Sequence, residues 1–180
     1  WIIKTEKPMY LGVVFDTPQK THRHIEYLDY KANRDAMPEG ISSAIPYIKK
    51  ILKSFNIPIF SLPGFEADDL IGTLAKQAEG QGFQTYMMTP DKDFAQLVTK
   101  KTFMYRPGNR GNPSEIWDVG KVCEKFNIQN VNQVIDFLAM VGDSVDNIPG
   151  IAGVGPKTSS KLLLKYNSIE EIYDSIYDLD

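Results

Sequence analysis

Residues 57–93 read IPIFSLPGFEADDLIGTLAKQAEGQGFQTYMMTPDKD. Within this stretch, 57–62 and 83–89 have the apolar pattern of short buried strands. Between them, 66–79 has the spacing of a helix. The inward face of that helix is expected to consist of Leu70, Ile71 and Leu74. A strand, a helix and a second strand in this order predict a parallel βαβ unit and hence an α/β fold.

The same alternation continues on both sides of this stretch. Residues 10–15 (YLGVVF) have the pattern of a strand that ends at Asp16, and 38–55 have that of an amphipathic helix. The apolar face of that helix is expected to consist of Ile41, Ile45, Ile48, Ile51 and Leu52. A short helix is expected at 92–98. Together these elements predict an α/β core over residues 1–113.

The pattern changes after the segment 107–113 (PGNRGNP), whose Gly, Pro and Asn content is typical of a loop. Beyond it only helical patterns remain, at 114–127, 130–141, 156–166 and 168–177. The sequence therefore predicts two domains, an α/β core (1–113) followed by a small all-helical subdomain (114–180).

Composition is that of an ordinary globular protein. Of 180 residues, 42% are hydrophobic and 24% are charged, and no apolar run approaches the about 20 residues of a membrane-spanning helix. Cys123 is the single cysteine, which excludes an internal disulfide and favours a reducing cytoplasm. The net charge is −3, but five acids and no Lys or Arg lie in 166–180. The remaining surface is therefore expected to be basic, as nucleic-acid binding requires.

Acidic residues stand in four groups at the ends of predicted elements. The groups are Asp16; Glu66, Asp68 and Asp69; Asp91 and Asp93; and Asp143 and Asp146. Taken singly, each group has a structural explanation, because acids stabilise helix N-termini and Asp is common in caps and turns. Taken together, carboxylates gathered in one pocket would repel one another unless cations neutralise them.

The kind of metal follows from the ligand atoms. Carboxylate oxygens favour hard ions such as Mg²⁺ or Mn²⁺. His22, His24 and Cys123 offer poor material for a zinc site. Two hard ions about 3.5–4 Å apart suit the in-line attack of water on a phosphodiester. The acidic groups therefore predict a two-metal hydrolase.

Residues 148–164 (IPGIAGVGPKTSSKLLL) combine a glycine-rich turn with an apolar helix that starts at Pro156. Glycines let the backbone approach a phosphate, and the N–H groups of a helix start bind anions. The residues expected to contact DNA here are Gly150, Gly153, Gly155, Lys157, Thr158 and Lys161. The pattern is typical of a helix–hairpin–helix, which grips the DNA backbone. The alternative is a tight interhelical turn with capping glycines.

The segment 30–34 (YKANR) is basic and precedes the long helix. Lys31 and Arg34 are expected to share a helical face and to clamp a phosphate, and Tyr30 is expected to stack on a base. The alternative is solvated surface, which is the ordinary role of a Lys/Arg pair.

These motifs follow one another in a specific order. They are VVFD (13–16), YKANR (30–34), GFEADDLIGTLA (64–75), TPDKDFAQL (89–97), GDSVDNIPG (142–150) and GVGPKT (153–158). The order and spacing resemble the 5′-nuclease (5′-3′ exonuclease) domain of bacterial DNA polymerase I, which belongs to the flap endonuclease family. The resemblance extends over essentially all 180 residues. It implies a PIN-like α/β core with a mostly parallel sheet flanked by helices, followed by a helix–hairpin–helix subdomain.

The resemblance also implies roles for individual residues. Lys31 and Arg34 correspond to catalytic residues that contact the scissile phosphate. The 148–158 turn corresponds to a hairpin that holds duplex DNA and a K⁺ ion. The carboxylates that correspond to the ligands of two or more Mg²⁺ or Mn²⁺ ions are Asp16, Glu66, Asp68, Asp69, Asp91, Asp93, Asp143 and Asp146.

The activity implied is that of a 5′-3′ exonuclease and flap endonuclease in replication and repair. Its DNA partners are 5′ flaps, nicked duplexes and primer-containing duplexes. A monomer in the bacterial cytoplasm is expected, with no membrane partner and with a polymerase portion in the same parent chain. The family's first strand and its Asp-Gly have no counterpart before Asp16, so residues 1–9 are expected to be the end of the following helix and its loop, in an N-terminally truncated chain.

Two other functions remain open from the sequence. The hairpin and the absent first strand are consistent with a non-catalytic, structure-specific DNA-binding fragment. A related α/β carboxylate nuclease acting on RNA is the third possibility, and the 148–158 hairpin argues against it.

Overall fold

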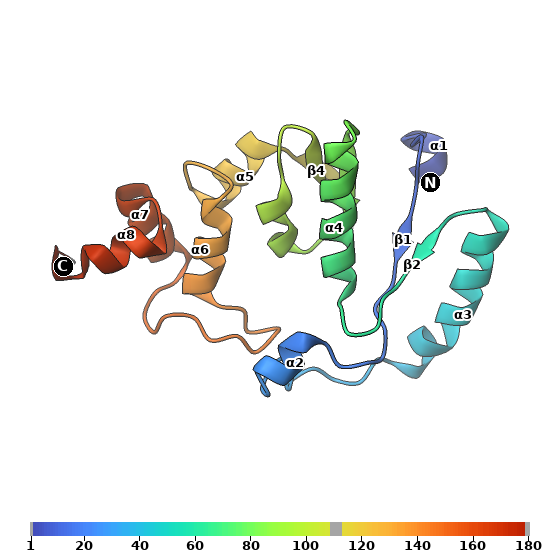
Figure 1. Ribbon diagram of the computed structural model, residues 1–180, viewed down its shortest axis with the longest axis horizontal. Coiled ribbons are helices and arrows are strands. Elements are labelled where there is room, and N and C mark those ends of the chain that lie inside the picture. The colour runs from blue at the N-terminus through green and yellow to red at the C-terminus, as the bar shows by residue number, and fades with distance from the viewer. Residues whose placement is uncertain (1, 109–112, 179–180) are drawn as a thin grey trace. The chain divides into compact units, whose positions relative to one another are not determined.

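The computed structural model describes residues 2–108 and 113–178 (Figure 1). The chain divides into two compact units, Trp1–Ile71 and Gly72–Asp180, and helix α4 (Ala67–Gly80) contains the point of division. Three sequence expectations lie partly outside the described residues. They concern Trp1 in the segment 1–9, the middle of the loop expected at 107–113, and Asp180 in the acidic C-terminal stretch.

The first unit contains a two-stranded parallel sheet. The N–H of Val13 donates to the carbonyl of Pro58 (3.0 Å), and that of Phe15 donates to the carbonyl of Phe60 (2.9 Å). Both strands are shorter than the 10–15 and 57–62 segments predicted. Besides the first turn of α4, the elements are α1 (Ile2–Thr5), β1 (Val13–Val14), α2 (His22–Glu26), α3 (Glu39–Ser54) and β2 (Ile59–Phe60).

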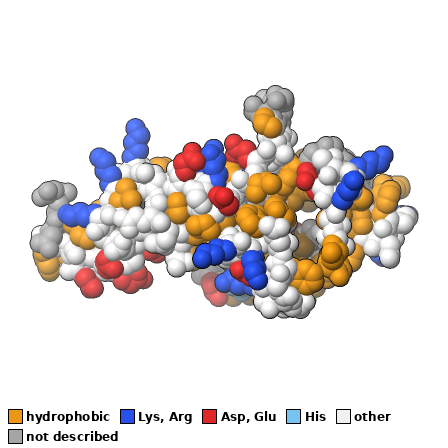
Figure 2. Space-filling view, turned by 90° about the horizontal axis from the view of Figure 1, so that it is seen from above, with side chains coloured by type: hydrophobic (Ala, Val, Ile, Leu, Met, Phe, Trp, Pro, Cys, Tyr) orange, Lys and Arg blue, Asp and Glu red, His pale blue; other side chains and the backbone are white. Residues whose placement is uncertain are grey.

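Helix α3 forms where the sequence predicts it, but its apolar face is not buried. Ile41, Ile48 and Ile51 are exposed, whereas Ile45 and Leu52 are half-buried. The physical reason is that α3 packs against β2, and a two-stranded sheet offers too little apolar surface to cover the whole helix face. Hydrophobic side chains are accordingly visible on the molecular surface (Figure 2).

The second unit contains a three-stranded sheet of β3 (Thr85–Met88), β4 (Thr102–Arg106) and β5 (Glu115–Trp117). The order is β3-β4-β5, with β3 and β4 parallel and β4 and β5 antiparallel. Neither β4 nor β5 was predicted, and the helix expected over 114–127 is wrong at its start. The reason is that Trp117 is buried as part of the sheet, while Asp118 caps the helix by accepting from the N–H of Lys121 (2.8 Å).

The helices of the second unit pack around one apolar core. Its most deeply buried side chains include Met87, Met104, Val122, Val134, Met140 and Leu163. The helices that follow the sheet are α5 (Val119–Phe126), α6 (Gln133–Val141), α7 (Pro156–Tyr166) and α8 (Ile169–Asp174), and the 3-10 turns are η1 (Lys92–Leu97) and η2 (Ile176–Asp178). None of the described helices combines the length and the apolar character needed to cross a membrane. Helix α7 matches the predicted 156–166, whereas α8 ends before residue 177.

The segment after β3 is fixed against α4. Gly72 leaves room for the side chain of Leu97 in η1, because an added Cβ would lie 3.2 Å from it. Farther along α4, Glu79 accepts hydrogen bonds from the hydroxyls of Thr99 (2.6 Å) and Thr102 (3.2 Å). These contacts hold η1, which carries Asp93, in a defined place.

Gln133 joins α6 to the end of α7 as a buried polar group with all its contacts made. Its side-chain oxygen accepts from the N–H groups of Gln129 (2.8 Å) and Asn130 (3.3 Å). Its amide nitrogen donates to the carbonyls of Leu163 (2.9 Å) and Asn167 (2.8 Å). Two helix ends therefore depend on one side chain.

We expect Gln133→Leu to lower the free energy of unfolding by about 2–3 kcal/mol, because buried N–H and C=O groups lose their partners. Urea denaturation measures the loss. Gln129→Leu is the matched control, since Gln129 is exposed and its amide makes one long bond (3.3 Å) to the carbonyl of Leu164; its cost should stay near 0.5 kcal/mol, that is, about the surface value. Equal losses in the two variants would contradict the assignment.

Candidate metal centre and nucleic-acid interface

The predicted carboxylates of the first unit gather at the start of α4. Asp16, two residues beyond β1, accepts a hydrogen bond from the N–H of Ala67 (2.7 Å) through Oδ1. Asp68 is exposed in the first turn of α4, and Glu66 immediately precedes that turn. This hydrogen bond, between residues 51 positions apart, brings Asp16 next to the start of α4, where Glu66 and Asp68 stand.

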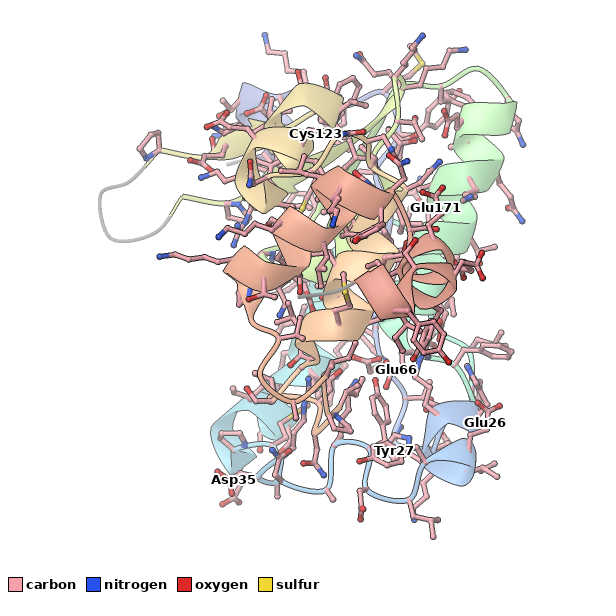
Figure 3. The ribbon with its side chains drawn as sticks, turned by 90° about the vertical axis from the view of Figure 1, so that its left-hand side faces the viewer. Glu26, Tyr27, Asp35, Glu66, Cys123 and Glu171 are labelled. Atoms are coloured by element: carbon pink, nitrogen blue, oxygen red, sulfur yellow. The ribbon has the colours of Figure 1, made fainter. Side chains whose placement is uncertain are left out.

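Glu66 is buried and is surrounded by donors from the segment 23–31. Its carboxylate accepts from Lys31 Nζ (2.7 Å) and from the Tyr30 hydroxyl (3.0 Å), and Arg23 lies 3.7 Å away. Burial alone would raise the pKa of Glu66, but the hydrogen bond and charge of Lys31, helped by Tyr30, outweigh it and lower that pKa. Figure 3 shows Glu66 in the same region as Tyr27, which belongs to this segment.

Asp69 is paired with an arginine that the sequence did not single out. Arg23 of α2 donates through both terminal nitrogens to the two carboxylate oxygens, at 2.7 and 2.8 Å. Asp69 also accepts from the N–H of Glu66 (3.0 Å). The hydrogen bond from Arg23 lowers the pKa of Asp69 to about 2, and the same bond raises the pKa of Arg23 above its usual value. Sequence separation explains why this partner was missed, because the two residues are 46 positions apart.

The segment 30–34 differs from its prediction. Tyr30 is buried, its hydroxyl is bonded to Glu66, and its ring meets His24 edge-on, so in this structure it is not placed to stack on a base. Lys31 adopts a left-handed backbone (φ +55°), and a turn rather than a shared helical face relates it to Arg34. The acidic environment of Glu66 accounts for both differences, since it draws Tyr30 and Lys31 inward.

The acids of the second unit lie in two segments that an ion pair connects. Asp91 caps η1 by accepting from the N–H of Asp93 (3.0 Å). Asp143 accepts from the N–H groups of Val145 (2.8 Å) and Asp146 (3.3 Å), and Lys92 Nζ lies 3.2 Å from its other oxygen. Burial would raise the pKa of Asp143, but these donors hold it below its usual value.

Asp93 has the opposite electrostatic environment. Burial raises its pKa to about 6, and the negative charges of Asp91, Asp143 and Asp146 act in the same direction. Its Oδ1 is buried and lacks a hydrogen-bond partner. An orphaned carboxylate oxygen among other carboxylates is a position that a hard cation fits.

The side chains are nevertheless not at coordination distance as they stand. Among residues 2–108 and 113–178, no three His, Cys, Asp or Glu side chains form a group that could hold a metal ion. The donor chemistry fits Mg²⁺ or Mn²⁺, whereas closed coordination geometry is not present.

The 148–158 hairpin is built on close backbone packing. Asp143 and Ile148 exchange two backbone hydrogen bonds (2.8 and 2.7 Å), and the N–H of Ile151 donates to the carbonyl of Met140 (2.8 Å). A Cβ added at Gly150 would lie 2.3 Å from the carbonyl oxygen of Val141. Gly150 therefore has a packing role at the end of α6, which the sequence analysis did not foresee.

The remaining hairpin residues lie before and within the start of α7. Gly153 has φ +80°, and a Cβ added there would meet no described atom beyond its chain neighbours within 4 Å, while Gly155 precedes Pro156 at the start of α7. The N-cap of α7, Gly155, provides no side-chain cap for the first N–H groups of the helix. Lys157, Thr158 and Lys161 are exposed there. Their contact with DNA stays a prediction.

Comparison with protein families decides the relationship. Residues 1–127 match the family model described as 5′-3′ exonuclease, N-terminal resolvase-like domain, and residues 129–180 match 5′-3′ exonuclease, C-terminal SAM fold. The chain belongs to the 5′-3′ exonuclease family. The predicted family resemblance is thereby confirmed, and the two family models meet near residue 128.

Two curated relatives illustrate the similarity. The 5′-3′ exonuclease of Aquifex aeolicus (strain VF5) is 46% identical over 171 residues, which are 95% of this chain and 57% of that protein. DNA polymerase I of Bacillus subtilis (strain 168) is 39% identical over 175 residues, which are 97% of this chain and 20% of that protein. The present chain thus spans about a fifth of the length of such a polymerase.

Solved structures with the same fold confirm the predicted fold class. The T5 D15 protein co-crystallised with metal ions has a TM-score of 0.80 and 24% identity, over 96% of this chain and 67% of that chain. The catalytic core of Rad2 in complex with a DNA substrate has a TM-score of 0.63 and 20% identity, over 92% of this chain and 52% of that chain. At these identities the similarity concerns the fold.

Three residues that contact or pack beside the candidate site residues were missed by sequence reasoning. Besides Arg23, Arg106 of β4 donates to the carbonyl of Pro90 (2.8 Å), directly before Asp91, and its guanidinium stacks over Trp117 (4.5 Å). Gly142 has φ +74° and lies against Gly150. Gly142 had a sequence signal, since a helix C-terminus favours Gly, whereas the two arginines had none.

Gly150→Ala is expected to lower the free energy of unfolding by about 3 kcal/mol, because the new methyl group would collide with backbone atoms of α6. Thermal or urea unfolding monitored by circular dichroism tests this. Gly155→Ala is the control, since nothing lies within 4 Å of its Cβ position; its cost should remain below about 1 kcal/mol. If Gly150→Ala is tolerated, the crowding inferred at α6 is absent.

The raised pKa of Asp93 predicts how the stability of the protein changes with pH. Above pH 6 the folded chain carries a half-buried, ionised carboxylate at a cost, and below it the folded state takes up a proton before the unfolded state does. In EDTA at pH 7.5, Asp93→Asn should therefore raise the free energy of unfolding by about 1 kcal/mol, a value discounted for solvent screening.

That advantage should shrink as the pH falls to 5, because the wild-type carboxyl is then mostly protonated. Asp35→Asn at an exposed position serves as the control and should change little at either pH. A loss of stability in Asp93→Asn at pH 7.5 would show that the charge of Asp93 is satisfied.

Proposed function

We propose that this chain is the 5′-nuclease part of a DNA polymerase I or of a free-standing 5′-3′ exonuclease, and that it hydrolyses DNA phosphodiester bonds with divalent metal ions. The single observation that carries the proposal is Asp93, whose buried, unpartnered oxygen lies under the influence of three further carboxylates. Family membership and the names of the relatives support the reaction class. Support for metal use comes from the T5 D15 protein, which was co-crystallised with metal ions.

Each unit contributes residues to metal binding under this proposal. Asp91, Asp93, Asp143 and Asp146 are the proposed ligands in the second unit, and Asp16, Glu66 and Asp68 those in the first. Mg²⁺ or Mn²⁺ bound there, in two or more copies, would neutralise the phosphate and make a water molecule nucleophilic near neutral pH. Lys92 offers a fixed positive charge beside Asp143.

The protein's own part in the reaction is to bind and orient the DNA. Lys31 and Arg34 are proposed to contact the scissile phosphate, and Lys157, Thr158 and Lys161 at the start of α7 to hold the duplex backbone, with Gly153 and Gly155 allowing close approach. A K⁺ ion at the hairpin is part of the proposal. Attack of water forms a new P–O bond while the P–O3′ bond breaks, leaving a 5′ phosphate and a 3′ hydroxyl. The proposed substrates are 5′ flaps, nicked duplexes and primer-containing duplexes.

The test is cleavage of a 5′-labelled flap DNA by this chain with Mg²⁺ and with EDTA. We expect cleavage in the presence of Mg²⁺ and none in EDTA. Asp91→Asn should slow the cleavage by at least about 100-fold, which corresponds to about 2.7 kcal/mol of transition-state stabilisation. Cleavage that persists in EDTA, or in a clean preparation of Asp91→Asn, would contradict the proposal.

Fluorescence anisotropy with the same DNA measures binding, and together with the cleavage assay it distinguishes the nuclease from a non-catalytic DNA-binding module. Lys157→Glu should weaken DNA binding and should reduce the slope of the logarithm of the binding constant against the logarithm of the salt concentration by about one. Lys76→Glu, the same charge change at an exposed position of α4, should do neither. Salt-dependent binding without Mg²⁺-dependent cleavage would favour a non-catalytic DNA-binding module over the nuclease.

A further inference from the structure

Arg23 and Asp69 form a bidentate pair that links α2 to α4. Both terminal nitrogens of Arg23 bind Asp69, at 2.7 and 2.8 Å, and both side chains are partly buried, with 35% and 24% of their surfaces exposed. Paired N–H···O bonds of this kind fix orientation as well as charge. The proposed reaction assigns no task to Arg23.

We propose that Arg23 is a positioning residue for the carboxylates at the start of α4, and that Asp69 is the side chain through which it acts rather than a metal ligand. This inference rests on the proposed metal-dependent nuclease function. It names Glu66 as the group whose place is set.

The contacts form one continuous chain from Arg23 to Glu66. Both oxygens of Asp69 are engaged by Arg23, and Oδ2 also accepts from the backbone N–H of Glu66 (3.0 Å). The N–H of Asp69 in turn donates to the carbonyl of Glu66 (3.1 Å). Asp69 is thus bonded to both the N–H and the carbonyl of Glu66. By holding Asp69, Arg23 therefore fixes the backbone position from which the Glu66 side chain extends.

The far end of Glu66 is held mainly by other side chains, although a terminal nitrogen of Arg23 also lies 3.7 Å from one of its oxygens. Its carboxylate meets Tyr30 and Lys31, whose chain continues directly from α2. Arg23 thus ties the backbone of Glu66 to the same segment that binds its carboxylate. Loss of the arginine would leave Glu66 attached at its tip but free to shift at its base.

Positioning and simple charge predict opposite effects on metal binding. A positive charge near carboxylates repels a cation, so removing only the charge of Arg23 would tighten binding. Removing a group that orients ligands instead weakens metal binding, by about 10-fold or more for partners of this kind. The sign of the change therefore separates the two roles.

The experiment is isothermal titration of MnCl₂ into the wild-type chain and three variants, Arg23→Gln, Arg23→Lys and Asp69→Asn. We expect the Kd for Mn²⁺ to rise about 10-fold in Arg23→Gln. Arg23→Lys should restore less than half of the loss on a logarithmic scale, because an ammonium group keeps the charge without the paired bonds. Lys53→Gln on exposed α3 removes the same charge and should leave the Kd within about twofold.

The double variant Arg23→Gln/Asp69→Asn identifies the role of Asp69. If Arg23 acts through Asp69, the double variant should bind Mn²⁺ no more weakly than the weaker single variant. Additive losses, with Asp69→Asn much the larger, would make Asp69 a direct ligand and overturn the inference. Circular dichroism and Tm, expected to fall by about 2–4 °C in each variant, confirm that all titrated chains are folded.

The remaining outcomes are equally decisive. Unchanged or tighter Mn²⁺ binding in folded Arg23→Gln, with normal binding in the wild type, overturns the positioning role and leaves the proposed function intact. If the wild-type chain binds no Mn²⁺, the proposed function itself fails.

Discussion

A carboxylate that leaves water needs a counter-charge or N–H donors, and this requirement organises the polar parts of both units. In the first unit, Glu66 and Asp69 are met by Lys31, Tyr30 and Arg23, and the pKa of each acid is lowered. In the second, Asp143 is met by backbone N–H groups and Lys92, whereas Asp93 keeps a buried oxygen without a partner and a raised pKa. In the first unit, Lys31 and Arg23 provide the positive charge that the acids require. In the second unit, the buried oxygen of Asp93 has no such partner, and a bound cation would provide one.

This difference assigns distinct physical roles to acids that look alike in the sequence. Asp69 is a part of the framework, because a carboxylate with three N–H contacts is held in one orientation. Asp93 resembles a group poised to bind, because its ionised form gains most from an incoming cation. The backbone around it is equally constrained: Gly142 and Gly150 approach so closely beyond α6 that the loop carrying Asp143 and Asp146 has little freedom.

Local sequence signals predicted the elements that depend on local physics. Pro156 at a helix start and the apolar spacing after it gave α7 its limits, and the acids around Ala67 (Glu66, Asp68 and Asp69) marked the start of α4. Strand β4 was missed because its five residues have no turn signal in front and no polar alternation. The apolar face of α3 was predicted as buried, but burial depends on what a neighbour offers, and β2 offers only two residues.

The carboxylates of the site were predictable because they recur in short motifs, while their partners were not. Arg23 and Asp69 are 46 residues apart, and an isolated arginine in a polar segment is ordinarily solvated. Tyr30 was expected to stack on a base, yet its hydroxyl donates to Glu66. A buried carboxylate is stabilised by each hydrogen bond that it accepts. Pairwise contacts that close long loops leave no trace in residue spacing.

Lys31 shows how such contacts bear on the proposed reaction. It is bonded to Glu66 at 2.7 Å and held at a φ of +55°, a conformation that costs a non-glycine residue about 1 kcal/mol. Its proposed phosphate contact requires that bond to break, which would leave Glu66 buried and ionised if nothing replaced the ammonium group. An exchange in which Glu66 gains a divalent cation as Lys31 gains a phosphate leaves every charge partnered. Occupation of the carboxylates and capture of the phosphate are therefore coupled steps under the proposed function, because neither can proceed far alone without an uncompensated buried charge.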